Sequence, residues 1–141
     1  MKTNLFQKFL LLLLAVGVIS IASCKDDDPT PLTLASLMAG SIDLNGATAA
    51  TNVPINSNIV ATFSTDVDMT TATTSTITLS AGSTNVTLGI TTSGSTVTLD
   101  PNNDLWGGAE FTLTFNGLKS TDGEVMTTKT VTFKTAGIGL S

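Results

Sequence analysis

The sequence predicts an all-β domain, folded as a sandwich of about seven short strands. Threonine occupies 27 of the 141 positions, nearly all of them from Thr48 onward. The β-branched threonine side chain fits a pleated sheet better than a helix. In the same region apolar residues alternate with threonine, and clusters of Gly, Asn, Asp and Ser separate the alternating runs. This pattern is typical of half-buried strands joined by turns.

The first 23 residues have the features of a secretory signal peptide. Residues 1–8 contain two lysines and no acidic residue, and residues 9–22 are almost wholly apolar. This apolar stretch is shorter than the roughly 20 residues of a membrane-spanning helix. Residues 21–24, Ile-Ala-Ser-Cys, resemble the lipobox of bacterial lipoproteins, in which an aliphatic residue and two small residues precede a cysteine. We therefore expect residues 1–23 to be removed as a lipoprotein signal peptide.

Cys24 is the only cysteine, so it has no disulfide partner in the chain. The lipobox resemblance implies a diacylglycerol on its sulfur and an acyl chain, such as palmitate, on the new amino terminus. Two or three such chains anchor a small domain to a membrane essentially permanently. The charged tract at residues 25–28 resembles the tract that follows the cysteine in some outward-facing lipoproteins of the Gram-negative outer membrane. The alternatives are a chance cysteine and an acidic run that is only a solvated tether.

The region between the cysteine and the alternating runs is expected to be a flexible acidic tether. Pro29, Pro31 and the preceding like charges interrupt any sustained strand pattern. We assign residues 24–40 to the lipidated cysteine and this tether, and residues 41–141 to the folded domain. Within the tether, residues 32–38 leave a short helix and a first strand open as alternatives.

From residue 41 onward the expected strands follow one another at short intervals. The alternating runs lie at residues 59–63, 76–79, 86–90, 96–99, 111–115 and 130–133. Two hairpin turns are predicted, at Ser93-Gly94-Ser95 and at Asp122-Gly123, because glycine and aspartate tolerate the backbone angles of tight turns. The apolar phase of the runs predicts a shared core of Ile59, Phe63, Leu79, Leu88, Leu99, Phe111, Leu113, Phe115 and Phe133.

The order and spacing of these runs resemble the SbsA-type bacterial Ig-like domain. The matching segments are residues 52–56 (NVPIN), 59–64 (IVATFS), 67–68, 96–101 (TVTLDP), 111–115 (FTLTF) and 131–135 (VTFKT). One departure is the turn at residues 120–124, where the family commonly has Asp-x-x-Gly-Asn and this chain has Ser-Thr-Asp-Gly-Glu. The resemblance covers about residues 45–136. It implies an immunoglobulin-like Greek-key β-sandwich that serves as a structural or adhesive module of cell-surface proteins.

The composition argues against an enzyme and against nucleic-acid binding. The chain has no His, Tyr or Arg, so common proton-transfer and phosphate-binding side chains are missing, and we assign no catalytic residue and no cofactor. Asp66 and Asp68 could act as paired carboxylates, but a solvated loop is the better interpretation. From Cys24 onward the chain has four lysines and eleven acidic residues, a net charge of −7 that repels nucleic acid.

Two weaker candidate sites fall in the region between two expected strands. Asp100, Asn102 and Asp104 alternate like the start of a calcium loop, but the later Gly and Glu fall at the wrong places for an EF-hand. Turn capping is therefore the default, with a weak calcium site as the alternative. Trp106, the only tryptophan, either caps the end of the sandwich or offers its ring to a sugar or a partner protein.

Together these observations predict a membrane-anchored, non-catalytic surface lipoprotein with one Ig-like module. Its predicted role is binding or adhesion, with a glycan or an envelope protein as ligand. The alternative is a structural spacer or an assembly subunit of a larger envelope complex.

Overall fold

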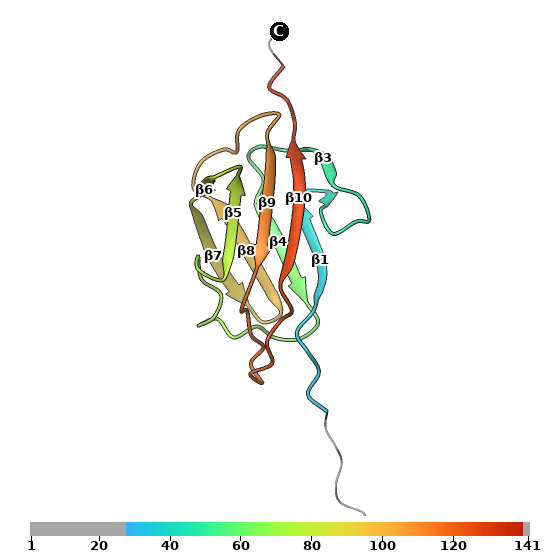
Figure 1. The fold of residues 1–141 in the computed structure, drawn as a ribbon, viewed down its shortest axis with the longest axis vertical. Coiled ribbons are helices and arrows are strands. Elements are labelled where there is room, and N and C mark those ends of the chain that lie inside the picture. The colour runs from blue at the N-terminus through green and yellow to red at the C-terminus, as the bar shows by residue number, and fades with distance from the viewer. Residues whose placement is uncertain (1–27, 140–141) are drawn as a thin grey trace, which may run out of the picture.

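The computed structural model describes residues 28–139, which form two facing β-sheets (Figure 1). Cys24 and the expected signal peptide lie outside the described residues. Within residues 28–139 no helix has the length and apolarity that crossing a bilayer requires. The predicted all-β sandwich is confirmed, with ten strands instead of about seven.

Each sheet contains five strands. The first has the order β2-β1-β4-β8-β7, and its strands are β1 (Leu34–Ala39), β2 (Ile42–Asp43), β4 (Ile59–Phe63), β7 (Leu88–Ser93) and β8 (Thr96–Pro101). The second has the order β3-β10-β9-β5-β6, and its strands are β3 (Ala50–Val53), β5 (Ile77–Ala81), β6 (Thr84–Val86), β9 (Glu110–Phe115) and β10 (Lys129–Thr135). Neighbouring strands are antiparallel except β3 and β10, which are parallel.

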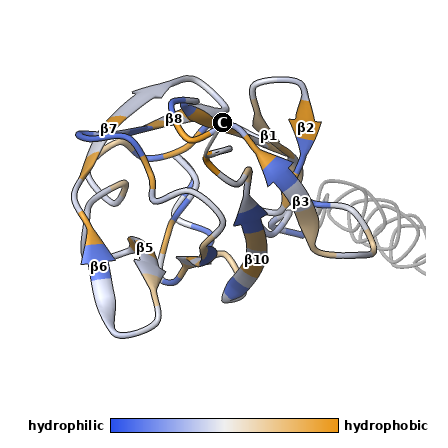
Figure 2. Cartoon of the chain, turned by 90° about the horizontal axis from the view of Figure 1, so that it is seen from above, coloured by the Kyte–Doolittle hydropathy of each residue, from blue (hydrophilic) through white to orange (hydrophobic). Residues whose placement is uncertain are grey.

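The core lies between the two sheets, which Figure 2 shows as facing layers when seen along the strands. All nine residues predicted for the core are buried, because alternate side chains of each strand point to the opposite sheet. Phe63 of β4 and Phe115 of β9 meet across the layers, with ring centroids 5.8 Å apart in an edge-to-face arrangement. This geometry is the favoured one for buried aromatic pairs.

The start of the domain differs from the expected boundary at residue 41. Residues 34–39 form β1, which pairs with both β2 and β4, so the choice between helix and strand is decided in favour of a strand. Leu32 and Leu37 are buried in the core. The register between β1 and β4 shifts between Leu34 and Ser36. Such a bulge interrupts the period of two, which explains why the sequence pattern did not reveal this strand.

The expected strand at residues 86–90 is two strands. Val86 of β6 pairs with Leu79 in the second sheet, whereas Leu88 of β7 pairs with Pro101 in the first sheet. The chain therefore passes from one sheet to the other at Thr87. The alternation continues through this crossing because both strands face the same core, so the sequence pattern could not show the break.

Both predicted hairpin turns are confirmed. Gly94 has a φ of 57° in the tight turn between β7 and β8, a backbone angle that glycine adopts without strain. In the second turn only Gly123 has a positive φ, 89°, and its N–H donates to the Ser120 carbonyl at 2.9 Å. The buried Ser120 hydroxyl accepts the Glu124 N–H at 3.1 Å. Serine thus closes the turn in which the sequence departs from the SbsA-type pattern.

Candidate functional site

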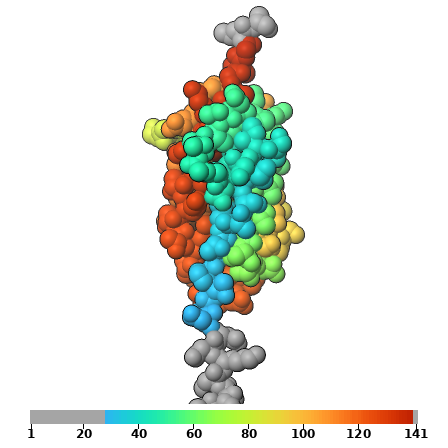
Figure 3. Space-filling view, turned by 90° about the vertical axis from the view of Figure 1, so that its right-hand side faces the viewer, coloured from blue at the N-terminus to red at the C-terminus, as the bar shows by residue number. Residues whose placement is uncertain are grey.

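The described chain enters and leaves the sandwich at opposite ends, as the ribbon and the space-filling view show (Figures 1 and 3). At the entry end, Thr33 accepts the Ser64 N–H at 2.9 Å, and the turn between β7 and β8 lies beside the end of β4. The loop of residues 102–109, between β8 and β9, lies at the other end, where Gly108 N–H donates to the Ala136 carbonyl. The six residues of β8 span about 20 Å between these ends.

Trp106 lies in this distal loop, and its ring is supported from below by the core. The indole stacks on Phe111, with ring centroids 6.1 Å apart and planes inclined by 28°. Phe111 in turn stacks on Phe133 at 5.6 Å. Both phenylalanines are fully buried, whereas 52% of Trp106 is exposed. The indole therefore packs on the core through Phe111, and about half of the side chain is exposed to solvent.

The backbone around Trp106 is held at three points. Leu105, which is buried, donates its N–H to the Ile55 carbonyl at 2.8 Å. The Trp106 carbonyl accepts the hydroxyl of Thr135 at 2.5 Å, and the same hydroxyl accepts the Ala109 N–H at 3.1 Å. Thr135 is one of only two buried polar residues in the described part of the chain. The loop that carries Trp106 is thus hydrogen-bonded to residues that are distant in the chain.

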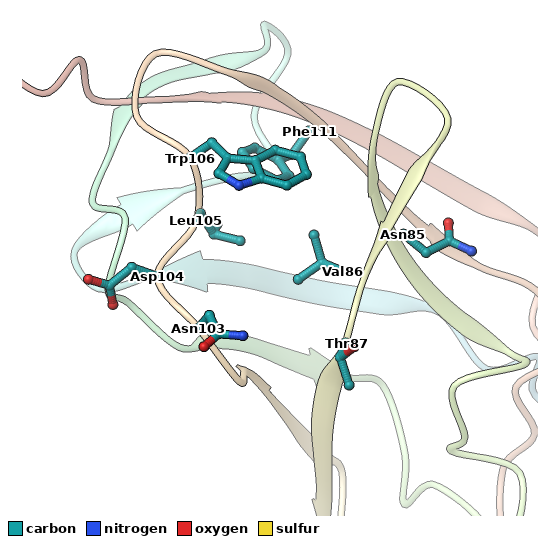
Figure 4. Close-up of a pocket in the computed structure, with 8 residues that line it drawn as sticks. All are labelled: Asn85, Val86, Thr87, Asn103, Asp104, Leu105, Trp106 and Phe111. Atoms are coloured by element: carbon teal, nitrogen blue, oxygen red, sulfur yellow. The ribbon is translucent and has the colours of Figure 1, made fainter.

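A hollow of about 180 Å³ opens beside the indole (Figure 4). We call it the Trp106 hollow. One wall comes from the distal loop and the other from the crossing between β6 and β7. The lining residues are Asn85, Val86, Thr87, Asn103, Asp104, Leu105, Trp106 and Phe111. Asn85, Thr87, Asn103 and Asp104 are exposed, so polar groups surround an apolar floor.

Sequence reasoning singled out Trp106 and Asp104 but missed the opposite wall of the Trp106 hollow. Asn85 is about 20 positions away in the chain from Trp106. Only the crossing of β6 and β7 between the sheets brings this wall to the distal loop. No local motif signals that crossing. The capping and contact roles weighed for Trp106 are compatible in this geometry, because the ring covers Phe111 with one face only.

The weak calcium candidates line a second, smaller hollow of about 140 Å³ together with Asn56 and Asn58. Asp100, Asn102 and Asp104 are all exposed there, and Asn102 N–H donates to the Thr87 carbonyl at 3.1 Å. In the described part of the chain, no three His, Cys, Asp or Glu residues are placed to hold a metal ion together. The calcium site remains an alternative that only metal titration would test.

Asp66 and Asp68 lie at the entry end, opposite Trp106. Asp68 accepts the hydroxyl of Thr70 at 2.7 Å and the Thr70 N–H at 3.0 Å. These two hydrogen bonds, and then the charge of Lys119, lower the pKa of the Asp68 carboxyl below its ordinary value. A carboxylate with a lowered pKa is a weak base, so the arrangement suits turn capping better than proton transfer.

We expect the Asp68 carboxyl to titrate below the ordinary value of 3.8. A lowered folded-state pKa stabilises the folded chain above the unfolded-state pKa, and this contribution is lost as the pH falls through the folded-state value. Thr70→Val removes the hydrogen bond from the threonine hydroxyl and should raise the titration midpoint of Asp68, whereas Thr70→Ser keeps the hydroxyl and should not. Carbon-detected NMR titration measures the midpoints, and identical values in the two variants would contradict this assignment.

Comparison with known proteins places the fold in a defined group. Residues 42–135 match a family described as bacterial Ig-like domain. Domains 1–6 of the surface layer protein SbsC superpose with a TM-score of 0.55 at 20% identity, covering 77% of this chain and 14% of that one. The N-terminal part of the bacterial S-layer protein SbsC superposes with a TM-score of 0.50 at 23% identity, covering 76% and 24%. The chain thus spans a quarter or less of either structure, and no curated protein sequence matches it.

Proposed function

The chain belongs to the family of bacterial Ig-like domains, and on that premise we propose that it is a lipid-anchored binding module of the bacterial cell surface. Its membrane attachment is the lipid on Cys24. Its ligand, a glycan or a protein of the envelope, binds at the Trp106 end. The proposed location is the outer face of the outer membrane.

The observation that carries this proposal is the separation of the two ends. The chain enters the sandwich beside the turn of β7 and β8, and the Trp106 hollow lies at the far end of the strands. Because the domain begins at Leu32, only residues 24–31 connect it to the anchor. Eight residues reach at most about 28 Å, so the domain stays near the membrane. The entry end then faces the membrane and the Trp106 end faces away from it.

A non-catalytic role agrees with the chemistry of the site. The lining of the Trp106 hollow has one carboxylate, no lysine and no histidine. A hydroxyl there has neither a histidine nor a lysine beside it to activate it as a nucleophile. The fold by itself defines no activity, so the function rests on this binding geometry.

The opposite ends also favour a second candidate function, a spacer within a larger envelope assembly. A domain that the chain enters at one end and leaves at the other can hold two attachment points apart. The two functions differ in one respect, because a spacer needs no ligand at Trp106.

We expect Cys24→Ala to carry no lipid. The variant lacks the sulfur that carries the diacylglycerol, whereas Ser23→Ala keeps a small residue before the cysteine and should still be lipidated. Intact-mass measurement of the purified protein should show cleavage before Cys24 and added acyl chains. An unmodified thiol at Cys24, or the same added acyl mass on the Cys24→Ala protein, would contradict the anchor.

A further inference from the structure

We infer that the Trp106 hollow binds one neutral pyranose ring of a surface glycan. This inference rests on the proposed function, and it specifies the ligand class at the same site. It follows from three features of the hollow, namely an aromatic platform, uncharged hydrogen-bonding groups beside it and the absence of lysine and arginine from its lining.

The platform is the open face of the Trp106 indole. A pyranose presents a patch of C–H groups on one side of its ring, and such a patch packs on an indole, which combines an apolar face with an N–H donor. Stacking on Phe111 positions the ring, and the hydrogen bond from Thr135 to the Trp106 carbonyl positions the backbone that carries it, before a ligand arrives. A pre-organised ring loses little conformational entropy on binding, which favours a small ligand with few contacts.

The polar groups around the platform suit sugar hydroxyls. Asn103 lies on the distal loop and is exposed beside the hollow, whereas Figure 4 shows the side chains of Asn85 and Asp104 directed away from the hollow. The amide of Asn103 offers donors and an acceptor, and each hydroxyl of a sugar is also both donor and acceptor. Thr87, on the opposite wall, is exposed and carries a hydroxyl that can donate and accept in the same way. Asn103 and Thr87 can therefore bind hydroxyls of a ring that stacks on Trp106.

Charge restricts the class of sugar. None of the residues that line the hollow is a lysine, and the chain has no arginine. The carboxylate of Asp104 and the overall negative charge of the chain disfavour a carboxylated or sulfated sugar. The ligand class is therefore a neutral hexose or N-acetylhexosamine unit.

The size of the hollow indicates a weak single site. A volume of about 180 Å³ is below the range typical of pockets that enclose a ligand, so most of a glycan chain stays outside. Many copies anchored on one surface can still bind a repeating glycan with useful avidity, because linked weak sites act together. Attachment to a membrane and weak recognition of a repeating polymer are thus consistent with one another.

The test is saturation-transfer NMR on the full chain isolated from membranes, in a detergent whose head group is not a sugar. The probes are cellohexaose and chitohexaose as neutral oligosaccharides and an oligogalacturonide as the acidic one. We expect saturation transfer to both neutral probes, with the strongest signals on the C–H protons of one ring, and none to the acidic probe. Emission of the sole tryptophan should shift with the neutral probes alone.

Variants connect the signal to the hollow. Trp106→Ala should abolish saturation transfer, and Asn103→Ala should weaken binding roughly tenfold through the loss of hydrogen bonds. The control is Met69→Ala, because Met69 is also an exposed apolar residue, 67% accessible, at the entry end. Asp104→Lys changes an exposed side chain and should allow the acidic probe to bind. A thermal unfolding curve for each variant identifies any loss of signal that comes from unfolding.

Several results would overturn the inference. The inference is wrong if neither neutral probe shows saturation transfer, or if the Trp106→Ala variant shows as much transfer as the unmodified chain. It is also wrong if the unmodified chain binds the acidic probe better than the neutral ones. If an envelope protein binds at Trp106 while both neutral sugars fail, the sugar inference is wrong and the proposed binding module survives. If Cys24 carries no lipid, the anchor fails independently of the sugar result.

Discussion

A chain that begins at residue 41 is expected not to form the sandwich, whereas a chain that begins at residue 28 is expected to fold. The shorter chain lacks β1, which lies between β2 and β4 and supplies hydrogen bonds to both. It also lacks Leu32 and Leu37, which are buried. Removing a buried leucine side chain costs about 2–5 kcal/mol, and small domains are stable by only about 5–15 kcal/mol in total.

Circular dichroism and urea unfolding of the two chains measure this effect. The longer chain should unfold in one cooperative transition and the shorter one should show none. A single substitution separates the role of the core from that of the strand. Leu37→Ala should lower the free energy of unfolding by about 2–5 kcal/mol, whereas Ala35→Ser, at an exposed position of β1, should change it by less than about 0.5 kcal/mol. Cooperative unfolding of the chain from residue 41 would show that β1 is dispensable.

Phe111→Ala is expected to lower the free energy of unfolding by about 3–5 kcal/mol. Phe111 is fully buried and stacks on both Phe133 and Trp106. Its removal leaves a cavity at the distal end of the core. It also removes the support of the indole, so we expect the emission of Trp106 to move toward longer wavelength in the folded variant.

The matched control for this substitution is Thr112→Ala on the outer face of the same strand. Its effect should stay within about 0.5 kcal/mol, because the threonine makes no contribution to the core. A change below about 1 kcal/mol for Phe111→Ala would mean that the burial of β9 is described wrongly. An unchanged emission spectrum would mean that the indole does not depend on Phe111.

The fold class and most of the core could be predicted from the sequence, for a reason visible in β9. Phe111, Leu113 and Phe115 alternate with threonines, and in an extended strand this places all three on one face. Once one face must be buried, the strand has only one register that hides its apolar side chains. The same argument holds for β4, for residues 97–99 of β8 and for residues 131–135 of β10, where buried and less buried residues alternate.

The candidate site could be predicted only in part. Trp106 could be recognised as a candidate contact residue because it is the only tryptophan and two glycines follow it. Its partners did not, because Asn85 and Thr135 are each separated from it by more than 20 residues. They lie near Trp106 through the pairing of β10 with β9 and the crossing of β6 to β7, which are long-range contacts.

By itself the sequence determined the all-β class, the phase of the main strands and the glycine turns, because each depends on residues that are neighbours in the chain. The tertiary structure alone decided that residues 34–39 form a strand, that residues 84–93 divide between two sheets and that residues 85–87 line the same hollow as Trp106. The pairing of a strand is chosen by the sheet edge it meets and by the shared core that it closes. The pairing of the strands is therefore a property of the whole sandwich, and it cannot be predicted from a local pattern of residues.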